Sequence, residues 1–168
     1  MRLWDAEGRR LYLTATERAR FLAAALHESR EDRLFCQVLH YSGCRPSEAS
    51  ELTPQRILMD DAELVFRTLK KRRIDLRGRE KKPQFRHVPV PKLLIDALDQ
   101  AFDLSHRVDL DSRLWPKDRT TQWRMVKRVM ARAGIEGLKP LPRGFAKALG
   151  SRCFPGLNRY PSTYCGTY

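Results

Sequence analysis

The sequence contains no apolar run of about eighteen residues or more, so it predicts no membrane-spanning helix. It also lacks a basic and apolar leader followed by a small-residue cleavage site, and we therefore expect a soluble, cytoplasmic protein. Cysteine is scarce, with four in 168 residues, which excludes the disulfide-rich scaffold of small secreted domains. A chain of this length with 42% hydrophobic residues can bury the core of one ordinary domain.

Acidic residues are outnumbered, because 20 Asp and Glu stand against 33 Lys and Arg and the formal net charge is +13. Soluble domains with such an excess of positive charge usually bind a polyanion, most often a nucleic acid. A well-solvated basic surface and a ribosome-associated protein are the alternatives. The charge alone therefore favours nucleic acid as the partner.

The spacing of apolar residues predicts five helices, at residues 13–26, 31–43, 45–52, 92–102 and 120–135. Thr14 and Glu17 form a capping box at the first helix, Gly43 suits the end of the second, and Pro46 suits the start of the third. The buried stripe predicted for the first helix consists of Phe21, Leu22, Ala25 and Leu26. In the fifth helix we expect Trp123, Val126, Val129, Met130 and Ala133 to face inward, and Arg124, Lys127, Arg128 and Arg132 to face outward.

The apolar period changes to two between the third and fourth helices. Residues 56–69 indicate two short strands around the turn at Asp60 and Asp61, and residues 85–91 indicate a third strand. Residues 1–12 show no clear period and are expected to form an extended lead-in. The predicted fold class is a mainly helical α+β domain with a small three-stranded antiparallel sheet.

Residues 67–86, between the second and third strands, contain ten Lys or Arg and only two acids. Such a segment can follow a phosphate backbone, because each contact releases counterions. Aromatic residues are sparse in it, which favours duplex DNA over single strands stacked on rings. A solvated hairpin tip and a nuclear-import-like basic run are the alternatives. The predicted DNA contacts here are Lys71, Arg72, Arg73, Arg77, Arg79, Lys81, Lys82, Arg86 and His87.

The stretch "YSGCRPSEASEL" places Arg45 between Gly43 and Glu48, directly after a predicted buried helix. An arginine held in such a turn can bind an anion, and Glu48 can hold its guanidinium in place. An ordinary turn between two helices is the alternative on these residues alone.

Together with "LTATERARFLAAAL", the strand "RHVPVP", "LWPKDRTTQWRMVKRVMARAGI" and "KPLPRGFAKALG", this stretch resembles the catalytic domain of tyrosine recombinases, the phage-integrase family. The resemblance covers about residues 10–150 in the family's order, and it looks closest to integrases of bacterial mobile elements. It implies a cytoplasmic, nucleoid-associated bacterial protein that binds double-stranded DNA, assembles as a homo-oligomer on it and has no membrane partner.

The resemblance also implies a mechanism that needs no metal or other cofactor. A tyrosine attacks a DNA phosphate, while arginines bind the phosphate oxygens and a lysine protonates the leaving oxygen. Arg45 matches the family's first arginine, with Glu48 as the acid beside it. Lys70 matches the hairpin lysine, with its neighbour Lys71 as the alternative. Arg143 and Lys147 match the outer positions of the family's second box.

Two features depart from the family pattern. Ala146 occupies the position of the family's second arginine, and residues 151–168 contain Pro155, Gly156 and Pro161 where the family has helices. We therefore divide the chain into a lead-in at 1–12, a partial integrase-like catalytic domain at 13–150 and an irregular tail at 151–168, translated out of frame or following a truncation junction. The only nucleophile candidates in the tail are Tyr160, Tyr164 and Tyr168.

Three functions stay open from the sequence. The first is an active recombinase, the second is a catalytically impaired remnant that binds DNA, and the third is a stand-alone basic binding or regulatory module on the same fold. We favour the second. Cys36, His40 and Cys44 recur every four residues, but the third lies beyond Gly43, so we expect buried thiols and no metal site. Trp115 and Trp123 are expected to anchor the core, and His27 and His106 to lie on the surface.

Overall fold

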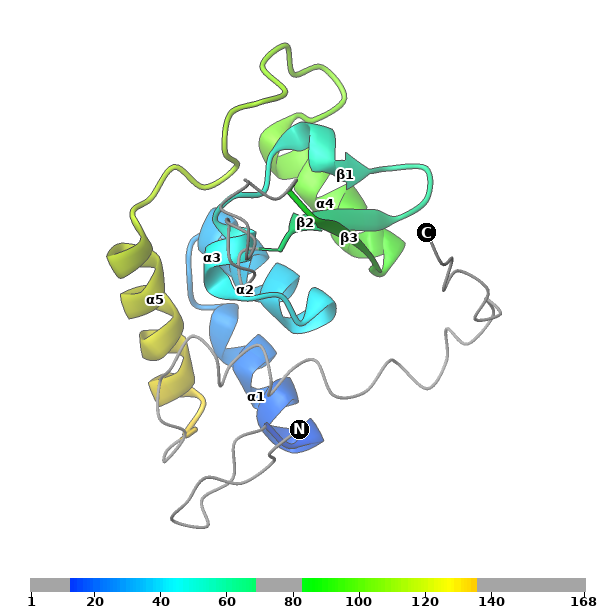
Figure 1. Cartoon of the computed structure of the whole chain (residues 1–168). Coiled ribbons are helices and arrows are strands. Elements are labelled where there is room, and N and C mark those ends of the chain that lie inside the picture. Colours follow the sequence, from blue (N-terminus) through cyan, green and yellow to red (C-terminus); the bar gives the residue numbers. More distant parts are fainter. Residues whose placement is uncertain (1–12, 69–82, 136–168) are drawn as a thin grey trace, which may run out of the picture.

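The computed structural model describes residues 13–68 and 83–135, where helices pack against one side of a small sheet (Figure 1). The predicted lead-in, most of the basic segment and the tail lie outside these residues. The chain order is α1 (Ala15–Ala25), α2 (Arg30–Ser42), α3 (Pro46–Ala49), the 3-10 turn η1 (Pro54–Arg56), β1 (Ile57–Leu58), β2 (Glu63–Arg67), β3 (Phe85–Pro89), α4 (Lys92–Phe102) and α5 (Arg119–Arg132).

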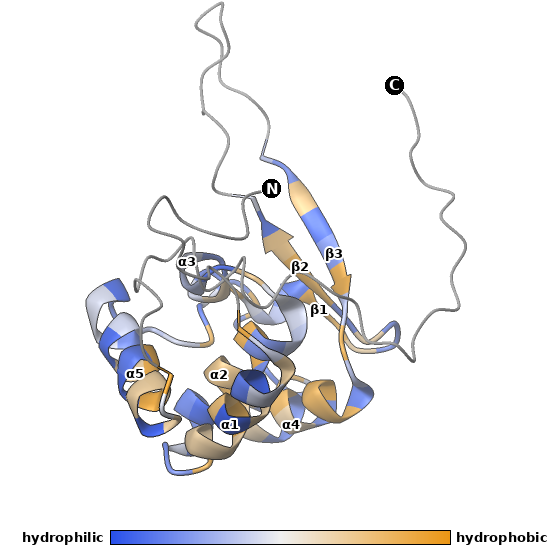
Figure 2. Cartoon of the chain, turned by 90° about the horizontal axis from the view of Figure 1, so that it is seen from below, coloured by the Kyte–Doolittle hydropathy of each residue, from blue (hydrophilic) through white to orange (hydrophobic). Residues whose placement is uncertain are grey.

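The sheet is antiparallel with strand order β1-β2-β3, so the predicted mainly helical α+β fold with a three-stranded sheet is confirmed. Val65 pairs with His87 and Phe66 pairs with Arg86 across β2 and β3. In Figure 2 the end of β2 and the start of β3 lie on the side away from α1 and α4. No helix in the described ranges has the length and apolar character to cross a bilayer.

The predicted capping box, the stop at Gly43 and the start at Pro46 are confirmed, whereas the third helix ends at Ala49 and not at Leu52. At α1 the Glu17 N–H donates to Thr14 Oγ1 (3.2 Å) and the Thr14 N–H donates to Glu17 Oε2 (2.7 Å), which completes the capping box. At α2 the chain turns at Gly43 with φ of 60°, a left-handed conformation that glycine adopts at little cost. Pro46 then begins α3.

Trp115 lies at the centre of the core, with 1% of its surface exposed. Its ring makes edge-to-face contacts with Phe35 of α2 and Phe102 of α4, at centroid distances of 5.3 and 5.4 Å. Its indole N–H donates to the Glu31 carbonyl oxygen (2.9 Å), so the one polar atom of this ring is satisfied. The expectation that Trp115 anchors the core is confirmed.

Some side chains predicted to face the core are more exposed than expected. Leu26 is 61% exposed, because α1 ends at Ala25 and the buried stripe continues through Ala24 instead. Trp123 is only partly buried, because Gln122 occupies the inner position at the start of α5. The Gln122 amide donates to the Trp115 carbonyl oxygen (3.5 Å), and its oxygen accepts from the Ser50 hydroxyl, so a polar side chain is satisfied there.

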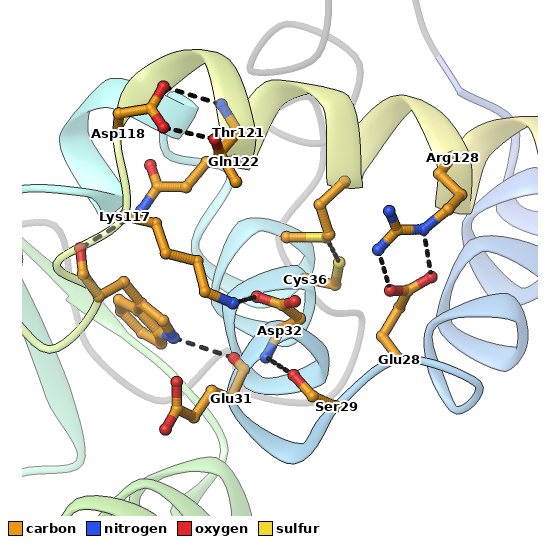
Figure 3. A network of polar contacts seen from close by, with 12 residues as sticks. Glu28, Ser29, Glu31, Asp32, Cys36, Lys117, Asp118, Thr121, Gln122 and Arg128 are labelled. Carbon is orange, nitrogen blue, oxygen red and sulfur yellow. Dashed lines mark hydrogen bonds and ion pairs between the residues drawn. The ribbon is translucent and has the colours of Figure 1, made fainter.

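Polar contacts attach α5 and the residues before it to the first two helices (Figure 3). Lys117 binds Asp32 of α2 (2.6 Å), and Glu28 accepts hydrogen bonds from Arg128 and Arg132 of α5. The Arg128 hydrogen bond lowers the pKa of the Glu28 carboxyl below its ordinary value. Two of the four predicted outward cations of α5 therefore serve to hold the helices together.

Candidate functional site

The turn between α2 and α3 positions Arg45. The Gly43 N–H donates to the Leu39 carbonyl oxygen (3.1 Å) where α2 ends, and the next residue, Cys44, is fully buried. Arg45 follows in an extended conformation and precedes Pro46, the first residue of α3. The backbone on both sides of Arg45 is therefore fixed by a buried side chain and by a helix start.

Glu48, on the first turn of α3, binds both the backbone and the side chain of Arg45. Its side chain is only 2% exposed, and its Oε1 accepts from Arg45 Nη1 at 2.8 Å. Its Oε2 accepts from the Arg45 backbone N–H at 3.0 Å. The buried carboxylate therefore fixes the position of the Arg45 guanidinium, as the sequence suggested.

Arg86 of β3 binds the same carboxylate, with 2.9 Å between its Nη2 and Glu48 Oε2. Arg86 stands opposite Phe66 in the sheet, and its guanidinium carbon lies 5.3 Å from the centre of that ring. Phe66 is buried, so Arg86 lies on the face of the sheet that packs on the core. A charged side chain on this face needs a partner, and Glu48 supplies one.

The cluster of Arg45, Glu48 and Arg86 has one surplus positive charge. The two arginine side chains are 26% and 40% exposed, while the carboxylate between them is covered. Each guanidinium makes one side-chain hydrogen bond to Glu48, which leaves further N–H donors at the surface. Such an arrangement can bind an anion with two or more oxygens.

No family model and no curated protein matches the chain. Several solved structures do, and three of them are similar over more than four fifths of this chain. XerA recombinase is 24% identical with a TM-score of 0.60, and the match covers 82% of this chain and 48% of that one. The catalytic domain of bacteriophage HP1 integrase is 20% identical with a TM-score of 0.54, covering 82% and 68%. XerH site-specific recombinase bound to its difH substrate is 14% identical with a TM-score of 0.62, covering 86% and 47%.

The chain has the fold of a tyrosine recombinase catalytic domain. It spans about half the length of the XerA and XerH chains and two thirds of the HP1 integrase domain. The fold that the sequence resemblance predicted is therefore confirmed, and Arg45 and Glu48 are the predicted site residues of this recombinase fold that the structure describes together.

Apart from Arg86 and His87, the other residues predicted for catalysis or DNA contact lie outside the described residues. These are the hairpin residues Lys70, Lys71, Arg72, Arg73, Arg77, Arg79, Lys81 and Lys82, the second-box residues Arg143, Ala146 and Lys147, and the tyrosines Tyr160, Tyr164 and Tyr168. The pairing of β2 and β3 continues one residue beyond both strands, since the Thr68 N–H donates to the Gln84 carbonyl oxygen (2.7 Å). Both ends of that segment therefore start from one end of the sheet, beside Arg86.

His87 points away from the arginine cluster. It alternates with Arg86 along β3, so its side chain emerges from the other face of the sheet, where it is 58% exposed. Its Nδ1 lies 3.0 Å from Glu63 Oε2 on β2. His87 therefore does not join Arg45, Glu48 and Arg86, and its contact with DNA stays a prediction.

Of the residues considered as a metal face, Cys36 and Cys44 are packed in the core and His40 is partly buried. Cys36 donates its S–H to the Met125 sulfur (3.6 Å), and burial raises the pKa of both Cys36 and Cys44, the latter to about 12. Over residues 13–68 and 83–135 no group of three His, Cys, Asp or Glu side chains could hold a metal ion.

The sequence reasoning placed Arg86 in a general basic segment and missed its contact with Glu48. The signal that could have indicated it was the alternation along β3. Arg86 and Val88 occupy the same side, and the register of the predicted hairpin puts that side against Phe66 and Leu64. A lone arginine among buried positions indicates a buried acid as its partner.

Proposed function

We propose that this protein is a DNA-binding domain of the tyrosine recombinase type, which acts in site-specific recombination or integration of a bacterial mobile element and is impaired in strand transfer. The observation that supports it most is the Arg45 guanidinium, fixed by buried Glu48 yet partly exposed, in a fold shared with three recombinases. XerH was solved with its DNA substrate, and a net charge of +13 suits the same partner here.

In the proposed complex, Arg45 donates its free N–H groups to the non-bridging oxygens of one DNA phosphate. An arginine is suited to this because its fork matches two oxygens and its charge is permanent. The basic residues that leave the sheet beside Arg86 follow the neighbouring phosphates, each contact releasing counterions. Complete chemistry would need a tyrosine that attacks phosphorus and Lys70 to protonate the leaving 5′ oxygen, giving a 3′-phosphotyrosine and a free 5′-hydroxyl.

We propose impaired strand transfer because Ala146 stands where the resemblance expects the second arginine. A donor aimed at the charge that develops on a phosphate contributes roughly 100- to 1,000-fold in rate, so alanine there removes a large part of the rate enhancement. Binding to duplex DNA depends on many phosphate contacts and survives the loss of one. The proposed protein therefore binds DNA and forms little or no covalent adduct.

Two measurements test the proposal. The first incubates the chain with a nicked duplex that traps the covalent intermediate, followed by denaturing electrophoresis. We expect no trapped adduct, and a clear adduct would show that the domain is an active recombinase. The second measures duplex binding by fluorescence anisotropy at several salt concentrations.

About five phosphate contacts predict a slope of log affinity against log salt near −4.5. Arg45→Gln is expected to weaken binding roughly tenfold and to reduce that slope by about 1, because one phosphate contact is lost. Arg30→Gln is the matched control. Arg30 is an exposed arginine at the other end of α2, and its side chain makes no hydrogen bond or ion pair with a described residue. Equal binding by the Arg45 and Arg30 variants would remove Arg45 from the interface.

A further inference from the structure

Arg86 is a second positive charge beside Glu48, although one arginine is enough to neutralise that carboxylate. One guanidinium neutralises the buried carboxylate, and Arg45 already binds it through a side-chain and a backbone N–H. The second guanidinium leaves the cluster with a net positive charge close to the surface. We infer that Arg45 and Arg86 together bind a single phosphodiester group, with Glu48 holding both guanidinium groups in position. This inference rests on the proposed function, since it names a second arginine for the same phosphate.

The distances favour one shared phosphate. Arg45 Nη1 lies 2.8 Å from one oxygen of Glu48, and Arg86 Nη2 lies 2.9 Å from the other. The two guanidinium groups therefore contact the two oxygens of one carboxylate, which brings both to the same small anion. A phosphodiester presents two such oxygens, which its non-bridging positions supply.

The arginine side chains are more exposed than the carboxylate between them, which suits an anion that arrives from solvent. Glu48 is almost fully covered, whereas Arg45 and Arg86 are 26% and 40% exposed, so solvent meets the positive groups and not the carboxylate. The donors that Glu48 leaves unused make no other side-chain hydrogen bond within the described ranges. An incoming phosphate thus finds free N–H groups without breaking the ion pairs that hold the forks.

Both forks are also held in advance. The Arg86 guanidinium lies over the Phe66 ring, 5.3 Å from its centre, on a strand position fixed by the β2–β3 register. Arg45 is held by the turn after Gly43 and by the first turn of α3. Since long side chains lose freedom when they bind, such prior ordering strengthens an anion contact.

A purely structural role for Arg86 makes a different prediction. In that case the Glu48–Arg86 pair only joins α3 to β3, and an Arg86 variant loses stability but keeps its salt-dependent DNA affinity. If the two arginines bind one phosphate, their losses in DNA affinity do not add, because either change disturbs the same contact. If they bind two separate phosphates, the losses add and the salt slope falls by about 1.8 in the double variant.

The experiment compares wild type, Arg45→Gln, Arg86→Gln, the double variant and the control Arg30→Gln in duplex binding against salt. We expect roughly a tenfold loss for each single site variant, little further loss in the double variant and a total slope change of about 0.9. An Arg86→Gln affinity equal to that of Arg30→Gln, or additive losses with a slope change of about 1.8, would overturn the inference.

A second measurement separates this inference from the proposed function. Inorganic phosphate is titrated into each variant without DNA, and the unfolding temperature is followed by circular dichroism. We expect phosphate to raise it in wild type and in Arg30→Gln, but not in Arg45→Gln or Arg86→Gln. If this holds while wild type fails to bind duplex DNA, the phosphate site stands and the DNA function falls. If phosphate stabilises all variants equally, or none, the inference falls.

Arg86→Lys keeps the experiment decisive if Arg86→Gln does not fold. Lysine retains the ion pair with Glu48 but lacks the fork that spans two oxygens. A folded lysine variant with wild-type phosphate stabilisation and wild-type salt slope would contradict the inference. We expect this variant to lose most of the phosphate-induced rise in unfolding temperature.

Discussion

Replacing Glu48 by glutamine removes the charge that holds both arginines and keeps the size of the side chain. The carboxylate is 2% exposed and accepts three hydrogen bonds, from the Arg45 backbone, Arg45 Nη1 and Arg86 Nη2. Glutamine keeps one acceptor oxygen, but its NH2 group replaces the other oxygen and then faces an arginine N–H, so two donors meet. Breaking a buried ion pair costs about 3–5 kcal/mol, and the partial exposure of both arginines reduces this to about 2–3 kcal/mol.

The assay is urea unfolding of the full chain, followed by tryptophan fluorescence, since Trp115 reports on the core. A loss of about 2–3 kcal/mol corresponds to a fall in the unfolding temperature of roughly 5–10 °C for a chain of this size. Glu63→Gln is the matched control, because Glu63 is a more exposed acid whose partner, His87, is 58% exposed. We expect that control to lose less than about 0.5 kcal/mol.

The result that would refute this reasoning is a Glu48→Gln variant as stable as Glu63→Gln. Glu48 would then not be held by desolvated ion pairs, and the arginines would not depend on it for their position. The inference of a shared phosphate would lose its physical basis, because nothing else that contacts both guanidinium groups would fix their separation.

Three further predictions concern stability. Gly43→Ala is expected to cost about 1–2 kcal/mol in urea unfolding, because φ of 60° at the end of α2 forces alanine into a left-handed conformation. Burial and the charge of Arg18 lower the pKa of His40 to about 4, so the unfolded chain binds more protons between pH 6.5 and 4 and stability falls as pH drops through that window; His40→Gln should remove this fall. The pKa of Glu28 is lowered by Arg128, so the stability difference between wild type and Glu28→Gln should be constant above about pH 5 and shrink below about pH 4.5, as measured by thermal unfolding at a series of pH values.

The elements of the fold could be predicted because their signals are local. The capping box at Thr14 and Glu17 and the helix stop at Gly43 each depend on residues within one turn, and the structure has both. The fine positions of burial were harder. Gln122 is buried because of a contact with Ser50, 72 residues away, and no local period contains that information.

The candidate site shows the same division. Arg45 and Glu48 lie three residues apart, so one short motif was enough to place them beside each other. Arg86 lies 38 residues from Glu48, and their contact exists only when the register of β2 and β3 and the packing of α3 are known. Sequence reasoning thus found the first arginine of the cluster and could not assign the second.

The proposal that this domain binds duplex DNA through phosphate contacts is tested by the salt dependence of wild-type binding, with Arg45→Gln measured alongside it. We expect a log–log slope near −4.5 for wild type, and a slope about 1 smaller in magnitude for the variant. A wild-type slope near zero would show that the domain does not bind DNA through phosphate contacts, since such binding must weaken as salt rises.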